Sequence, residues 1–240
     1  MKVKLTFFFL IVFILLSGRE IPKISAQTQE TFNFWFEVGE EEYVYGPTGR
    51  GLDNPFFTLN TQNGIKAFSA NANTHKFSYP GLTNLILEKT NVLGPGTPGS
   101  FDECGAWLNS IYIDPNDTNH YLGWYHAEAK CNYNIGKVKQ SVAFAESFDG
   151  GNSWTKRGQV LTADSTLICN DNPNDSSDLC LEDDVGNHKV IQIGDYFYMF
   201  FLAGADWKIH IARSKVAEAG KPGTWEKYYN GSWGEPGLGG

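Results

Sequence analysis

Several features that would place this chain in a familiar class are missing from its sequence. The apolar spacing of amphipathic helices is nearly absent, which argues against a helical domain. There is no stripe of basic residues, and the net charge of −8 argues against nucleic acid as a partner. Cys-x-x-Cys pairs and histidine clusters are also missing, so no metal centre is predicted.

Cysteine is scarce, with four residues in the whole chain. An even number in an exported protein predicts two disulfides, and three pairings are compatible with the count. We favour Cys104–Cys131, which would tie neighbouring strands together. The second pair would then be Cys169–Cys180, which would close an acidic loop.

Long apolar runs are confined to the N-terminus. Residues 5–16 are apolar, follow Met-Lys-Val-Lys, and precede a small-residue cleavage site at Ile24-Ser25-Ala26. This pattern predicts a signal peptide over residues 1–26 and a secreted or periplasmic protein, with an uncleaved anchor as the alternative. The run is too short for a comfortable membrane span, so we expect no membrane contact after cleavage.

Short alternating apolar runs, separated by Gly, Asn, Asp and Pro, are typical of an all-β fold. The clearest unit has four expected strands, Trp107–Asp114, Tyr121–Ala127, Lys139–Glu146 and Trp154–Leu161. A second unit repeats this order with Lys189–Ile193, Tyr196–Leu202, Lys208–Ser214 and Trp225–Tyr229. Residues 32–98 are expected to hold an irregular first unit, with late strands at Ile65–Ser69 and Leu82–Leu93.

The turn between the last two strands of the clearest unit has a distinctive sequence, Ser-Phe-Asp-Gly-Gly-Asn-Ser-Trp over residues 147–154. Asp149 is expected to bond backbone N–H groups two residues on, while Gly150 and Gly151 supply positive φ. Trp154 is expected to pack its ring under the loop. The pattern resembles the Asp-box of β-propeller glycosidases and sialidases, which implies a hairpin of a propeller blade.

Four-stranded antiparallel units in succession predict a β-propeller, and about three blades are present in residues 27–240. A propeller needs at least four blades to close. We therefore expect an N-terminal fragment of a five-bladed propeller, incomplete at its C-terminus. A complete domain with a smaller closed sheet arrangement is the alternative.

Glycoside hydrolysis needs two carboxylates that flank the scissile bond. In a propeller, such residues are expected where the first strand of each blade begins. Asp53 occupies this position in the first unit, and Asp102 and Glu103 occupy it in the second. Asp184 precedes the third unit, and Glu235 follows it, where a fourth blade would begin. Each of them could instead be a solvated loop acid.

The blade order, the Trp107 strand and Tyr196–Phe201 resemble the five-bladed propeller glycoside hydrolases, which include arabinanases, xylosidases and invertases. The resemblance implies Asp53 as base or nucleophile and Asp102 or Asp184 as the group that tunes the acid. It implies Glu235 or Glu103 as the proton donor. The stretch Ala106–Asn109 departs from the family, because Asn109 stands where the family has Asp.

Abundant aromatic residues suit the apolar face of a sugar, so a carbohydrate is the expected substrate. Trp107 and His188 are the expected binding residues, and His126 is expected to be a satisfied histidine within the sheet. No cofactor is required. Calcium is conceivable in the oxygen-rich loop 169–178, although its spacing differs from an EF-hand. We expect a monomer.

Two other functions fit the fold. An Asp-box sialidase would use three arginines, and the mature chain offers only Arg50, Arg157 and Arg213. A propeller without catalysis, which binds sugar or protein, would be favoured if the acids at the blade entries did not converge.

Overall fold

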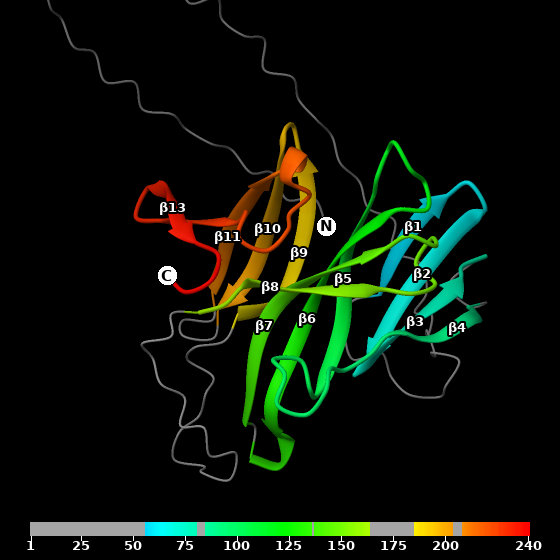
Figure 1. Cartoon of the computed structure of the whole chain (residues 1–240), viewed down its shortest axis with the longest axis horizontal. Helices are drawn as coiled ribbons and strands as arrows, with labels where there is room; N and C mark the ends of the chain where they lie inside the picture. Colours follow the sequence, from blue (N-terminus) through cyan, green and yellow to red (C-terminus); the bar gives the residue numbers. More distant parts are fainter. Residues whose placement is uncertain (1–55, 81–84, 136, 164–184, 204–207) are drawn as a thin grey trace, which may run out of the picture. The chain divides into compact units, whose positions relative to one another are not determined.

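The computed structural model describes residues 56–80, 85–135, 137–163, 185–203 and 208–240. Within these ranges the chain forms three antiparallel sheets, two short 3-10 turns and no α-helix (Figure 1). The predicted all-β class is therefore confirmed. The predicted signal peptide, Asp53, Asp184 and the pair Cys169 and Cys180 lie outside the described residues.

Sheet A is the irregular first unit, and its strands pair in chain order. They are β1 (Phe57–Thr61), β2 (Gly64–Asn71), β3 (Asn73–Ser78) and β4 (Ile86–Leu93). The sequence indicated β2 and β4 but not β1 and β3. β3 was missed because its sequence, Asn-Thr-His-Lys-Phe-Ser, is mostly polar, although Thr74, Lys76 and Phe77 are buried.

Sheet B matches the predicted four-stranded unit closely. Its strands, again in chain order, are β5 (Gly105–Ile113), β6 (Tyr121–Asn132), β7 (Lys137–Ser147) and β8 (Thr155–Leu161). β6 is five residues longer than the expected Tyr121–Ala127. The disulfide joins Cys104, the residue before β5, to Cys131, the second-to-last residue of β6. The predicted pairing of these two cysteines is therefore confirmed.

Sheet C contains one strand more than predicted. It consists of β9 (Val185–Ile193), β10 (Tyr196–Ala203), β11 (Lys208–Lys215), β12 (Glu226–Tyr229) and β13 (Ser232–Pro236). These strands also pair in chain order, so β13 is the edge strand farthest from β9. The tight turn at Asn230 and Gly231, both with positive φ, folds β13 back against β12.

The first strands of the three sheets are neighbours. The backbone N–H of Val190 on β9 donates to Ser110 Oγ on β5 (2.9 Å), and Lys189 Nζ lies 3.9 Å from the centre of the Phe57 ring on β1. At the end where β5 begins, the Ala106 N–H donates to the Ala72 carbonyl of the β2–β3 turn. We call this end, where β1, β5 and β9 begin, the entry end, and the opposite end the turn end.

Two apolar layers lie between the sheets, because β6 alternates its side chains between them. Trp124 packs with Phe144, Phe197 and Trp225 in the layer between sheets B and C. Tyr125 belongs to the layer between sheets A and B, with Phe68, Val92, Leu108 and Ala143. Face-to-face stacking of four-stranded sheets is what the repeated pattern predicted.

The other face of sheet C is also apolar. Phe200 on β10 alternates with the buried Met199 and Phe201, and it shares its face with Ile191, Ile193 and Ile209. These four side chains are exposed, Ile209 by 68%. The described sheets do not close into a ring.

The 147–154 turn is built around one carboxylate. Asp149 Oδ1 accepts hydrogen bonds from Ser147 Oγ (2.8 Å) and from the backbone N–H groups of Asn152 and Ser153 (both 2.9 Å). These N–H groups lie three and four residues on, rather than the two expected. Gly150 and Gly151 have φ of 68° and 82°, as predicted, and the Trp154 ring packs edge-on against Phe68.

Candidate active site at the entry end

Asp102 is buried, but its carboxylate is bonded to the protein. Oδ2 accepts a hydrogen bond from Tyr125 OH (3.0 Å) and forms an ion pair with Lys156 on β8, while Oδ1 accepts from Ser100 Oγ (2.9 Å). Burial and the neighbouring carboxylate raise the pKa of Tyr125, so this hydroxyl stays a donor. The contacts give Asp102 the role of tying the β4–β5 connection to sheet B.

Glu103 is likewise occupied by backbone donors. Its Oε2 accepts from the Gly99 N–H (2.6 Å) and its Oε1 from the Lys130 N–H (2.9 Å). These two hydrogen bonds lower the pKa of Glu103 below its ordinary value. A lowered pKa favours the ionised carboxylate, which is the opposite of what a proton donor needs.

Glu235 does not follow the third sheet, so this part of the prediction was wrong. It lies in β13, opposite Lys227 of β12, and three strands separate β13 from β9. The reason is the unrecognised tight turn at Asn230-Gly231, which adds a fifth strand to the sheet. Among the described residues, Glu235 is therefore not brought together with Asp102 or Glu103.

Both predicted binding residues, Trp107 and His188, lie near His126. Trp107 on β5 is the pairing partner of His126 on β6, and their rings are in edge contact with centroids 5.5 Å apart. Gly186 on β9 packs directly on His126, since a Cβ at position 186 would lie 2.5 Å from His126 Nδ1. His188 follows on β9, two residues on.

His188 is fully buried, and burial is the main reason why its pKa falls to about 3, with the nearby His126 as the next cause. It is therefore neutral at physiological pH. Both of its ring nitrogens lack a hydrogen-bond partner among the described residues. The backbone of Trp124 lies beside the ring and partly offsets the fall in the pKa of His188.

Glu128 is the acid of this region that the sequence did not single out. It lies near the end of β6, where its Oε1 is 3.0 Å from His126 Nε2 and its Oε2 accepts from Tyr133 OH (2.6 Å). Alternation along the strand was the available signal, because residues 124, 126 and 128 share one face. We call Trp107, His126, Glu128 and His188 the entry-end cluster.

Several polar atoms of this region have no partner within the described part of the chain. They are Trp107 Nε1, His126 Nδ1, both nitrogens of His188 and both side-chain atoms of Asn109. A buried polar group without a partner costs about 1–3 kcal/mol, so such groups normally have a water, a ligand or a neighbour. If His126 donates its Nε2 proton to Glu128, its Nδ1 is an acceptor, while Trp107 Nε1–H is a donor. A hydroxyl group, which both donates and accepts, can satisfy either atom.

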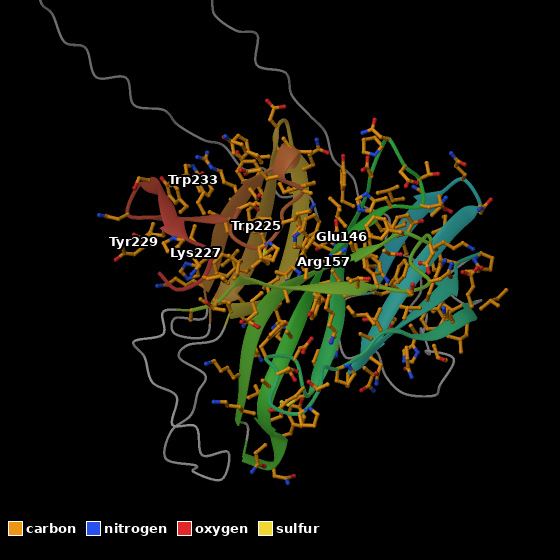
Figure 2. All side chains as sticks on the ribbon, viewed as in Figure 1. Glu146, Arg157, Trp225, Lys227, Tyr229 and Trp233 are labelled. Carbon is orange, nitrogen blue, oxygen red and sulfur yellow. A yellow bond between two sulfur atoms is a disulfide. The ribbon has the colours of Figure 1, made fainter. Side chains whose placement is uncertain are left out.

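The described arginines are not available for a substrate carboxylate. Arg157 on β8 donates to Glu146 Oε2 on β7 (2.7 Å), and Figure 2 shows the two side by side. Arg213 donates to Glu226 Oε1 (2.6 Å) and lies over the Trp233 ring at 4.2 Å. Arg50 lies outside the described residues. These pairs weigh against the sialidase hypothesis.

Within the described ranges, no group of three or more His, Cys, Asp or Glu side chains is arranged to hold a metal ion. The loop 169–178, considered for calcium, lies outside these ranges. None of the described helices is long and apolar enough to cross a membrane.

No protein-family model and no curated protein matches this chain. Among solved structures, it resembles Zg3597, a family 117 glycoside hydrolase from the marine bacterium Zobellia galactanivorans, with a TM-score of 0.51 and 11% identity. The match covers 72% of this chain and 54% of that one. A glycosyl hydrolase from Bacteroides ovatus matches with a TM-score of 0.49 and 10% identity, over 75% of this chain and 52% of that one.

A family 43 endo-arabinanase from Bacillus licheniformis matches more weakly, with a TM-score of 0.36 and 12% identity, over 68% of this chain and 71% of that one. The chain thus spans about half the length of the first two structures. At these identities the likeness concerns the fold alone, which this chain shares in part with Zg3597.

Proposed function

We propose that the chain is a secreted glycoside hydrolase that cleaves an oligosaccharide or polysaccharide at the entry end by a paired-carboxylate mechanism. The observation that carries this proposal is the entry-end cluster, in which buried ring nitrogens of Trp107, His126 and His188 lack partners beside the carboxylate of Glu128. Such atoms suit the hydroxyl groups of a sugar, each of which donates and accepts.

Tyr133 offers the approach to the cluster. Its ring is exposed by 62%, while its hydroxyl donates to Glu128. A sugar ring stacked on Tyr133 would lie beside Glu128, the carboxylate that bonds His126. In this arrangement Glu128 is a positioning residue, because it fixes the His126 ring and its tautomer.

The reacting carboxylates remain those of the blade entries. Asp53 as base or nucleophile and Asp184 as its partner are retained as proposals, since they precede β1 and β9 in sequence. Asp102 and Glu103 fit a structural role better, given their bonded oxygens. The resemblance of the 147–154 turn to the Asp-box, and of the blade order to five-bladed propellers, supports a glycosidase in this group.

One observation favours a second function, glycan binding without catalysis. The described carboxylates at this end are all engaged, Asp102 with Lys156 and Glu103 with two backbone N–H groups. Carboxylates held in this way are poorly suited to act as the acid and base pair that glycoside hydrolysis requires. A propeller lectin would bind sugar through the entry-end cluster and would not need a pair of catalytic carboxylates.

The test uses the full-length secreted protein on arabinan, xylan, fructan and sialoside substrates, with reducing-sugar release and calorimetric binding measured in parallel. Hydrolysis that is lost in Asp184→Asn while binding persists supports the glycosidase. Binding without hydrolysis in the parent protein, abolished by Glu128→Gln, supports the lectin and contradicts the glycosidase. Glu235→Gln, on the edge strand, is the matched carboxylate control.

A further inference from the structure

A cavity of about 510 Å³ lies at the turn end, opposite the entry-end cluster. Its walls come from the β1–β2 turn, from the end of β5 with the turn into β6, and from the 147–154 turn. It is therefore formed by loops of two sheets, A and B. Its volume is in the range of sites that take small molecules, about 300–1,000 Å³.

The charged groups around this cavity are paired within the protein. Lys76 Nζ donates to the Gly150 carbonyl (2.8 Å) and to Asn152 Oδ1 (3.0 Å), and it lies 3.7 Å from Glu88 Oε2. Lys66 forms an ion pair with the same Glu88. Asp149 is saturated by the hydrogen bonds of its own turn. Because each of these charged groups already has a partner within the protein, the cavity suits a neutral ligand.

The uncharged polar side chains of the cavity wall, in contrast, are available for hydrogen bonds to a ligand. The side-chain amides of Asn60, Gln62 and Asn119 make no hydrogen bond to other residues in the described ranges, and neither does the hydroxyl of Tyr121. Each amide offers donors and an acceptor, and the tyrosine hydroxyl offers both. Ile113 adds an apolar surface to the same wall. Paired donors and acceptors beside an apolar patch match the polyhydroxylated ring of a sugar.

We propose that this cavity is a second binding site, which takes a neutral mono- or disaccharide. It lies away from the entry end and does not depend on the proposed hydrolysis. Its rigidity comes from Lys76, which anchors the 147–154 turn of sheet B to sheet A, and from the packing of Trp154 beneath Tyr121 and Phe68.

The experiment titrates the full chain with arabinose, xylose, galactose, glucose and mannose and with disaccharides of each, using ligand-detected NMR. Glucuronate and galactose sulfate are the charged comparison probes. Tyr121→Phe removes only a hydroxyl and keeps the ring packing, so we expect about five-fold weaker binding in a folded protein. Gln62→Ala with Asn119→Ala should abolish saturable binding. Gln192→Ala, which removes an exposed amide at the β9–β10 turn, should leave it unchanged.

The inference is overturned if no neutral sugar gives saturable binding, or if the charged probes bind better. It is also overturned if binding is unchanged in Tyr121→Phe and in Gln62→Ala with Asn119→Ala but lost in Glu128→Gln, because the sugar would then sit at the entry end. Sugar binding that needs Gln62 and Asn119 supports the site even if the parent protein hydrolyses nothing.

Discussion

The Nε2 atom of His126 lies 3.0 Å from Oε1 of Glu128, and both side chains are buried at the entry end. A carboxylate can only accept, so it fixes the proton of a neutral His126 on Nε2 and leaves Nδ1 as an acceptor. The pair therefore prepares the imidazole to receive a hydrogen bond beside the donor Trp107 Nε1–H.

Glu128→Gln should reverse this preference. The glutamine amide can donate to Nε2, which would move the imidazole proton to Nδ1 and place two donors side by side in the cluster. We expect sugar binding or hydrolysis at the entry end to weaken by at least ten-fold, since a buried donor loses its acceptor. The tautomer of His126, read from its ring ¹⁵N shifts, should change in parallel.

Glu128→Asp keeps the carboxylate and should restore the tautomer of His126, with partial recovery of activity. A loss of activity in Glu128→Gln without any change of tautomer would contradict the positioning role.

Asp102→Asn should affect stability rather than catalysis. The substitution removes the negative partner of Lys156 and weakens the acceptor for the buried Tyr125 hydroxyl. We expect the free energy of unfolding, measured with urea, to fall by about 2–3 kcal/mol. Adding Lys156→Met should recover part of this loss, because the unpaired cation is removed as well. A hundred-fold loss of hydrolysis in fully folded Asp102→Asn would instead make it a catalytic residue.

The fold was largely predictable because it depends on local alternation. In sheets B and C, strands such as Tyr196–Ala203 are short apolar runs in which every second side chain, here Phe197, Met199 and Phe201, is buried. Turns such as Gly194 carry Gly at a positive φ. β13 was missed because its sequence, Ser-Trp-Gly-Glu-Pro, has little β propensity. It pairs with β12 because the turn at Asn230 folds the chain back. Its strand state depends on β12.

The site was predictable only in part, because side-chain partners come from distant positions. Trp107 and His188 could be selected from strand starts, and the fold brings both to His126. Nothing local, however, shows that Asp102 meets Lys156, 54 residues on, or that Glu103 meets the backbone of Lys130. These contacts favour a structural role for the two predicted catalytic acids.

Asp149→Ala should destabilise the β7–β8 hairpin, because the backbone N–H groups of Asn152 and Ser153 lose their shared acceptor. The expected loss is about 1–2 kcal/mol in the free energy of unfolding, as for other side chains that cap exposed N–H groups. Asp149→Asn, which keeps one acceptor oxygen, should lose less. An equal loss in both variants would contradict this account of the turn.

The Asp149 carboxylate also makes the stability of the protein depend on pH in the acid range. Burial alone would raise the pKa of Asp149, but the hydrogen bonds from Ser153, Ser147 and Asn152 outweigh it and hold the pKa below its ordinary value. Its contribution is therefore complete above the unfolded pKa of about 3.9 and is lost as pH falls through the folded value. Thermal melts of the parent and Asp149→Asn should converge below this pH.

Replacing Cys104 and Cys131 together by serine should lower the free energy of unfolding by about 3–4 kcal/mol, from the chain entropy that a cross-link across 27 residues removes. Because the bond ties the start of β5 to the end of β6, hydrogen exchange should accelerate first at Trp107 and Glu128. Uniform acceleration across all three sheets would show that the disulfide acts only on the unfolded chain.

His188 makes the stability of the protein dependent on pH above the range of the carboxylates. Burial lowers its pKa to about 3, while in the unfolded chain it titrates near its ordinary value of 6.5. Below pH 6.5 the unfolded state therefore binds a proton that the folded state excludes. Stability is complete above this pH and falls as pH drops towards 3, by up to about 1.4 kcal/mol per pH unit.

His188→Gln removes this titration. Relative to its own value at pH 7.5, the parent protein should lose about 2 kcal/mol more than the variant by pH 5, measured by urea unfolding at each pH. The comparison within each protein cancels the packing cost of the substitution. Parallel slopes for both proteins would mean that His188 is protonated in the folded state, held by an acceptor in the cluster, and the neutral hydroxyl-binding role of its ring would have to be abandoned.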